Sequence, residues 1–149
     1  MIKKVFLLGN PNVGKSVVFS RLTGVRVISS NYPGSTVELS KGFLVRSNEE
    51  VEVVDLPGTY SLDPTSSAEE VAVSLLRGCV KNETVVVNVL DATNLERNLL
   101  LTIQLLEEGY PVIVCLNMWD ESVHRGVSID TKKLEDLLHV PVVPTCAVT

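Results

Sequence analysis

One short run near the amino terminus constrains the fold more than any other feature. Residues 9–16 read Gly-Asn-Pro-Asn-Val-Gly-Lys-Ser, which matches G-x-x-x-x-G-K-[ST] at every defined position. A β-branched and aliphatic run, Lys3–Gly9, precedes it, and a helix-like run, Lys15–Leu22, follows it. In that setting the backbone N–H groups of the loop point at phosphates, and the helix dipole adds positive potential. The run therefore predicts a phosphate-binding loop, called the P-loop below.

The rest of the chain predicts a mostly parallel α/β sheet. Strand-like and helix-like runs alternate after one hairpin, a pattern that favours helices on both faces of the sheet. With the strand before the P-loop we expect six strands, the others being Val37–Arg46, Glu50–Asp55, Thr84–Leu90, Pro111–Asn117 and Pro141–Thr145. The further expected helices are Ser66–Arg77, Asn94–Glu108 and Asp130–Leu138. We expect the closing carboxyl-terminal helix of such a fold to be missing.

Length and composition narrow the class of protein. The 149 residues suffice for one domain with a core, and a hydrophobic fraction of 45% is typical of a globular chain. The net charge of −5 argues against nucleic acid as the main partner. No apolar run reaches the roughly 18 residues of a membrane span, so the chain as given is expected to be soluble and intracellular. Three scattered cysteines are interpreted as reduced thiols.

Residues at the end of the P-loop and in a later motif predict a magnesium-dependent nucleotide site. Lys15 is expected to reach the β- and γ-phosphates, and the Ser16 hydroxyl to coordinate Mg²⁺. The run Asp55-Leu56-Pro57-Gly58 follows a predicted strand, so that Asp55 can hold a magnesium-bound water. Gly58 can offer its N–H to a γ-phosphate and must reposition once that phosphate leaves.

A turn-rich loop, residues 31–38, lies between these two motifs and is expected to act as a switch. A threonine there can complete the Mg²⁺ shell only while a nucleoside triphosphate is bound, which would order the loop. Thr36 is the expected ligand and Ser35 is its rival, because both are ordinary loop residues.

Two later motifs predict guanine as the base. Asp120, in Asn117-Met118-Trp119-Asp120, can accept from N1–H and the exocyclic amine of guanine, a donor pair that adenine lacks. Asn117 can pin neighbouring loops, and a backbone N–H of residues 145–147 can meet guanine O6. The expected nucleotide-binding residues are Gly9, Asn10, Pro11, Asn12, Val13, Gly14, Lys15, Ser16, Val17, Gly34, Ser35, Thr36, Asp55, Leu56, Pro57, Gly58, Asn117, Met118, Asp120, Thr145, Cys146 and Ala147.

Hydrolysis is expected to be slow, with Lys15, Thr36 and Gly58 as the catalytic groups. Many GTPases place a water-orienting glutamine directly after D-x-x-G, but this chain has the shorter Thr59. Arg21 and Arg26 are interpreted as solvated or packing residues rather than as catalytic cations.

The sequence resembles the GTPase domain of the ferrous iron transporter family FeoB over essentially its whole length. Beyond the motifs above, the resemblance is carried by the runs at residues 31–38, 55–62, 88–99 and 104–113, and by Met118 where many GTPases have lysine. Val17, Val18 and Trp119 depart from residues common in that family.

The resemblance implies a Ras-like G domain of the P-loop NTPase class. It implies that residues 1–149 are the amino-terminal, GTP-binding part of a larger membrane transporter, on the cytoplasmic face of the membrane. Helical and transmembrane domains that pass ferrous iron would follow. It also implies that Asn12 helps to hold K⁺ during hydrolysis. Homo-oligomer formation stays open. The alternative function is a translation- or tRNA-associated P-loop GTPase, against which the acidic balance counts.

Overall fold

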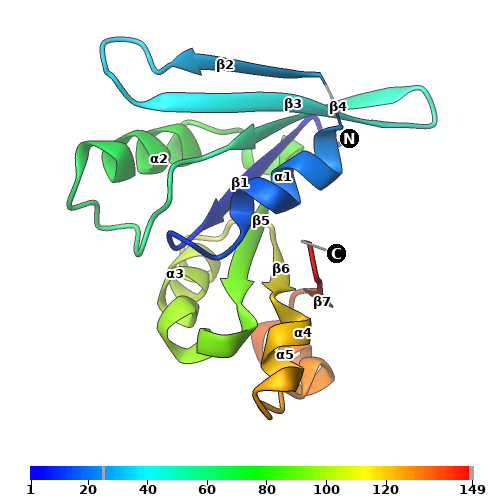
Figure 1. Ribbon diagram of the computed structural model, residues 1–149. Coiled ribbons are helices and arrows are strands. Elements are labelled where there is room, and N and C mark those ends of the chain that lie inside the picture. Colours follow the sequence, from blue (N-terminus) through cyan, green and yellow to red (C-terminus); the bar gives the residue numbers. More distant parts are fainter. Residues whose placement is uncertain (25, 148–149) are drawn as a thin grey trace.

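A computed structural model describes residues 1–24 and 26–147. Within these residues the chain forms one seven-stranded sheet in the order β2-β3-β4-β1-β5-β6-β7 (Figure 1). The β2–β3 and β3–β4 pairs are antiparallel, and the remaining pairs are parallel. The predicted α/β class with a mostly parallel sheet is therefore confirmed.

The element bounds follow the sequence motifs closely. The strands are β1 Lys4–Gly9, β2 Val27–Asn31, β3 Glu38–Arg46, β4 Glu49–Asp55, β5 Thr84–Asp91, β6 Val112–Asn117 and β7 Val142–Pro144. The α-helices are α1 Lys15–Thr23, α2 Ser67–Arg77, α3 Leu95–Glu107, α4 Trp119–His124 and α5 Thr131–Leu138. Two short 3₁₀ turns, η1 Lys81–Glu83 and η2 Ala92–Asn94, flank β5.

Helices cover both faces of the sheet, as predicted. The larger core cluster joins Phe6, Val54 and Val114 of the sheet to α2 through Leu76 and to α3 through Leu101. The smaller cluster, on the opposite face, packs Val18 and Phe19 of α1 against other residues of the strands, among them Leu7, Val53 and Val89. Burial of these aliphatic side chains is the main source of stability, at about 25 cal/mol per Å² of apolar surface removed from water.

The predicted count of six strands is wrong, because β2 was missed. All five of its residues are exposed, and its sequence, VISSN, has only two apolar residues and no alternation. The strand forms because its backbone pairs with β3 at the edge of the sheet, from Val27↔Gly42 to Asn31↔Glu38. An edge strand of this kind leaves no hydrophobic pattern from which it could be predicted.

The sheet topology gathers the predicted motifs at one edge. The P-loop follows β1, Asp55 ends β4, Asp91 ends β5 and Asn117 ends β6. Since these four strands are adjacent and parallel, their carboxyl ends meet at the same edge, where open α/β sheets bind ligands.

Among the described residues no helix is long and apolar enough to cross a membrane. The predicted lack of a closing helix concerns the end of the chain, beyond the described residues.

Candidate nucleotide-binding site

The P-loop adopts the backbone conformation that a phosphate cradle needs. Asn12 and Gly14 have left-handed φ angles of 66° and 84°, and Gly14 is the N-cap of α1. The loop borders a cavity of about 420 Å³ on the side of α1. Its lining residues are Asn10, Pro11, Asn12, Gly14, Lys15, Ser16, Val17 and Gly58. The cavity is of a size to receive a di- or triphosphate chain, with the amino terminus of α1 at its wall.

The P-loop lysine is held by the predicted magnesium-site carboxylate. Lys15 Nζ donates to Asp55 Oδ1, and both side chains are largely buried. Ser16 borders the same cavity. A hydroxyl and a carboxylate are the hard oxygen donors that Mg²⁺ prefers, so these residues fit the ion. Ser16 and Asp55 would hold the ion, and the Lys15 ammonium group, once released from Asp55, would be available to the phosphates.

The segment after Asp55, residues 56–66, is called switch II. Gly58 lies against the P-loop, so closely that a Cβ there would stand 3.0 Å from Pro11 Cγ. The backbone N–H of Thr59 donates to Gly9 O at 2.8 Å. The Thr59 side chain is fully buried and its hydroxyl donates to Pro57 O at 2.8 Å. The hydroxyl is therefore occupied within the loop and faces no solvent.

The loop formed by residues 31–38, called switch I, lies away from the phosphate cavity. Tyr32 N donates to Val37 O at 2.7 Å, which closes the loop on itself. Ser35 Oγ donates to Tyr32 O and accepts from Val37 N, both at 3.1 Å. Thr36 is exposed and does not border the cavity. Its role as a magnesium ligand stays a prediction that requires this loop to move.

Asn117 joins the predicted base-recognition loops to the P-loop. Its side chain is buried, and its Nδ2 donates to Val13 O at 3.0 Å. Its Oδ1 accepts from Thr145 Oγ1 at 3.0 Å and from Ala147 N at 3.1 Å. One side chain thus fixes the spacing between the phosphate cradle and the loop that follows β7.

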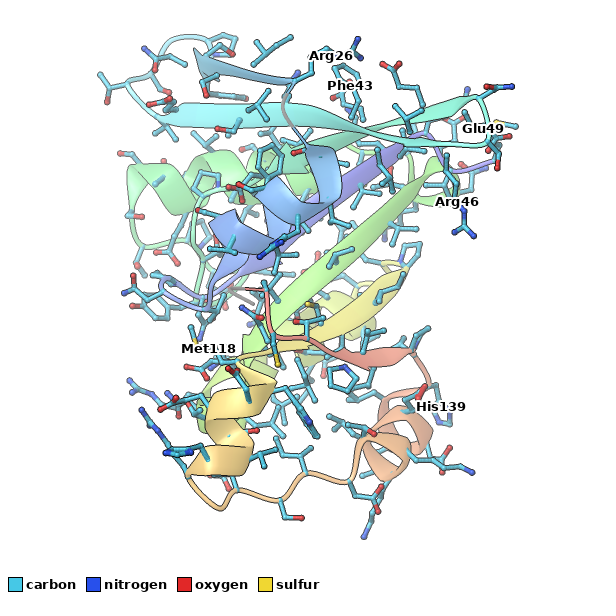
Figure 2. The ribbon with its side chains drawn as sticks, turned by 45° about the vertical axis from the view of Figure 1, so that its right-hand side comes forward. Arg26, Phe43, Arg46, Glu49, Met118 and His139 are labelled. Atoms are coloured by element: carbon cyan, nitrogen blue, oxygen red, sulfur yellow. The ribbon has the colours of Figure 1, made fainter. Side chains whose placement is uncertain are left out.

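Residues after Asn117 form the rest of the predicted base-recognition motif. Met118 has a left-handed φ of 58° and is the N-cap of α4, and Figure 2 shows it where β6 passes into that helix. Trp119 N donates to Thr145 O at 3.1 Å, which holds the two base loops side by side. The Asp120 side chain is exposed and forms no ion pair among the described residues, so its carboxylate is available to a ligand.

The buried thiol of Cys115 contacts the loop that follows β7. Cys115 Sγ lies 3.3 Å from Thr145 Oγ1, within the same hydrogen-bonded group as Asn117. Burial raises the pKa of the Cys115 thiol, and the contact with Thr145 offsets only part of this rise. Cys115 therefore stays a neutral thiol that packs rather than reacts.

Neither arginine considered from the sequence reaches the phosphate cavity. Arg21 Nε donates to Ala147 O at 3.0 Å, so that it braces the loop after β7. Arg26 stacks on Phe43 at 4.5 Å from its ring centre and donates to Glu50 at 2.7 Å. Figure 2 shows the Arg26–Phe43 pair at the β2–β3 side of the sheet, far from Met118.

Sequence reasoning missed two side chains that hold switch II. Buried Glu69 of α2 accepts from Tyr60 N at 3.1 Å and from the Thr65 hydroxyl at 2.8 Å. Gln104 of α3 accepts from Leu62 N at 2.7 Å. Glu69 belongs to none of the nucleotide motifs, and Gln104 is 42 residues from its partner. No local pattern in the sequence signals either contact.

The strand order, the cradle after β1 and the carboxylate at the end of β4 define the class of protein: a P-loop guanine-nucleotide-binding (G) domain. A family model described as Ferrous iron transport protein B matches residues 3–149. The chain belongs to this family.

Curated relatives agree with the family match. The Fe(2+) transporter FeoB of Salmonella typhimurium is 47% identical over 143 residues, which cover 93% of this chain and 18% of that protein. The Fe(2+) transport protein A/Fe(2+) transporter FeoB fusion protein of Porphyromonas gingivalis is 44% identical over 145 residues, covering 95% and 17%. The chain thus spans about a fifth of the length of the curated relatives it matches.

Solved structures share both the fold and the sequence. The cytosolic domain of L. pneumophila FeoB superposes with a TM-score of 0.91 at 43% identity, over 97% of this chain and 63% of that one. A GDP-bound mutant of S. thermophilus NFeoB gives 0.90 at 43% identity, over 99% and 57%. The FeoB G-domain from Methanococcus jannaschii gives 0.83 at 41% identity, over 99% and 88%.

Proposed function

We propose that this chain binds GTP and GDP with Mg²⁺, hydrolyses GTP slowly and changes the conformation of its switches between the two states. The observation that carries the proposal is the set of hydrogen bonds made by the Asn117 side chain. The Asn117 side chain ties the P-loop, which borders the phosphate cavity, to the loop after β7, and the exposed Asp120 follows Asn117 by three residues. The GDP bound to the S. thermophilus relative supports the same choice of nucleotide.

Base recognition is tested by changing Asp120. Asp120→Asn replaces one carboxylate oxygen by an NH₂ donor. This donor would face the exocyclic amine of guanine, which is also a donor, but it could pair with the carbonyl that xanthine has at that position. We expect isothermal titration calorimetry with Mg²⁺ to show GDP binding that weakens roughly 100-fold or more in the variant, with xanthosine diphosphate now preferred. Unchanged discrimination between GDP and ADP in the variant would contradict the assignment of Asp120.

Slow hydrolysis follows from the groups near switch II. The Thr59 hydroxyl is bonded to Pro57 O, and Arg21 and Arg26 are engaged elsewhere. Backbone groups of the switches are left to orient water, and K⁺ held by Asn12 would supply the charge of an arginine finger. Single-turnover hydrolysis should be faster in K⁺ than in Na⁺, and Thr59→Ala should keep most activity. Equal rates in both salts would remove K⁺ from the proposal.

The family supports a role in ferrous iron uptake for the longer protein. We propose that the domain lies on the cytoplasmic face of the membrane and regulates or energises transport by helical and transmembrane domains that follow. The full-length protein in vesicles should then take up Fe²⁺ at rates that differ among GTP, GDP and a non-hydrolysable GTP analogue. If the analogue supports Fe²⁺ uptake, occupancy of the site by a triphosphate is enough. If uptake is lost with the analogue, GTP turnover is required. Identical rates with all three would exclude nucleotide control.

A further inference from the structure

Two sequence runs that carry the family resemblance contain none of the predicted nucleotide-binding residues. Residues 88–99 and 104–113 flank and form α3, which packs on the sheet beside α2 (Figure 1). Three polar side chains in or between these runs nevertheless point inward. Asn88, Asn98 and Thr102 are all buried, which is costly unless each is hydrogen-bonded.

Buried hydrogen bonds anchor α3 directly beneath the P-loop. Thr102 Oγ1 donates to Asn88 Oδ1 at 2.5 Å, and Asn88 Nδ2 donates to Leu8 O at 3.2 Å. Leu8 immediately precedes the first glycine of the P-loop. One turn earlier in the helix, Asn98 Oδ1 accepts from Asp91 N at 3.3 Å. These contacts tie α3 to β5 and, through Asn88, to β1, the strand that precedes the phosphate cradle.

The same helix also holds the distal end of switch II. Gln104 Oε1 accepts from Leu62 N at 2.7 Å, and the Leu62 side chain is buried in the core cluster that contains Leu101 and Leu105. Nearer the phosphates, Thr59 N bonds to Gly9 O. Both ends of residues 59–62 are thus tied to parts of the molecule that hydrogen bonds connect, the P-loop and α3.

We propose that Gln104 is a positioning residue for switch II, and this inference rests on the proposed GTP-dependent function. By fixing Leu62, it confines any movement of switch II to the residues before it. Gly58 is then presented to a γ-phosphate from a defined anchor. GDP has no γ-phosphate and does not use this contact, so Gln104 should affect the GTP state alone.

The test compares three substitutions on α3 of this chain. Gln104→Met keeps the length of the side chain but removes the acceptor, and Gln104→Glu keeps an acceptor oxygen. Glu107→Met, at an exposed position of the same helix, is the matched control. Affinities for GDP and for a non-hydrolysable GTP analogue are measured by fluorescence titration with Mg²⁺. Hydrogen exchange reports the protection of the Leu62 amide.

In Gln104→Met we expect a GDP affinity within twofold of the parent chain and a preference for the GTP analogue that falls roughly three- to tenfold. The Leu62 amide should exchange faster by a similar factor. Gln104→Glu should restore both properties, and Glu107→Met should change neither.

An unchanged or increased preference for the GTP analogue in Gln104→Met, or an equal loss of affinity for both nucleotides, would overturn the inference. So would unaltered protection of the Leu62 amide. Absence of GDP binding by the parent chain would instead refute the proposed function. In that case Leu62 protection still decides whether Gln104 holds the segment.

Discussion

Gly14 stands where the P-loop turns into α1, in a conformation that few other residues tolerate. Its φ is 84°, and a Cβ there would collide with the Asn117 amide nitrogen. A side chain at this position therefore brings both backbone strain and displacement of Asn117. The glycine of the sequence motif is required here for two independent physical reasons, of which the pattern reveals only the first.

We expect Gly14→Ala to lower the free energy of unfolding by about 3 kcal/mol and to abolish measurable nucleotide binding. Gly126→Ala is the matched control, because Gly126 has a φ of 76° but nothing lies within 4 Å of its would-be Cβ. Strain alone should cost the control about 1 kcal/mol and leave binding intact. Urea unfolding and GDP titration measure both effects. Equal costs in the two variants would show that the Asn117 contact contributes nothing.

Local patterns identified the individual residues of the phosphate and base motifs and the role of Asn117 in pinning neighbouring loops, but not the partner atoms of its bonds. Lys15, Asp55 and Asn117 could be named because each belongs to a short motif with its own chemistry. The bond from Asn117 to Val13 O spans 104 residues and depends on the order of the strands. Glu69 and Gln104 belong to neither the phosphate motifs nor the base motifs, and only the packing of α2 and α3 brings them to switch II.

At the scale of elements, the clearest departures from the sequence expectation are β2 and α4. Neither has the length or the apolar period on which prediction depends. The helix α4 has six residues, and β2 is stabilised by pairing with β3 alone. Longer elements with buried faces, such as β5 and α3, were placed within two residues of their observed ends.

The first turn of helix α2 contains Glu69, whose ionised carboxylate stabilises switch II. Ser66 caps the helix by accepting from Glu69 N at 3.2 Å, and Glu69 in turn accepts from Tyr60 and Thr65. Burial alone would raise the pKa of Glu69. The hydrogen bonds from Thr65, Tyr60 and Ser66 outweigh burial, so the pKa lies below its ordinary value of 4.5.

Because the folded pKa is lowered, the charged form contributes stability above pH 4.5, and the contribution is lost as the pH falls through the folded value. Glu69→Gln should lower the free energy of unfolding by about 2 kcal/mol near neutral pH, and by less as the solution is acidified. Urea unfolding over a pH series measures this gap. Glu70→Gln, at the next and exposed position, should show little effect at any pH. A gap for Glu69→Gln that is independent of pH would contradict the role of its charge.

At the scale of the whole molecule, ligand binding and folding should be linked. A ligand at 100 times its dissociation constant stabilises the state that it binds by about 2.7 kcal/mol. For a domain of this size we expect GDP with Mg²⁺ to raise the melting temperature by about 5 to 10 °C. ADP at the same concentration should not, and differential scanning fluorimetry distinguishes the two. An equal shift with both would mean that the site does not read the base.

The three-way bond of Asn117 has a consequence for which ligands the site can hold. Its amide ties the loop after β1 to the loops after β6 and β7. The protein, and not the incoming molecule, therefore sets the distance between the phosphate cradle and the loops predicted to hold the base. A compound whose linker between base and phosphates is longer or shorter than that of a natural nucleotide must leave one end unattached, however well each end would bind on its own.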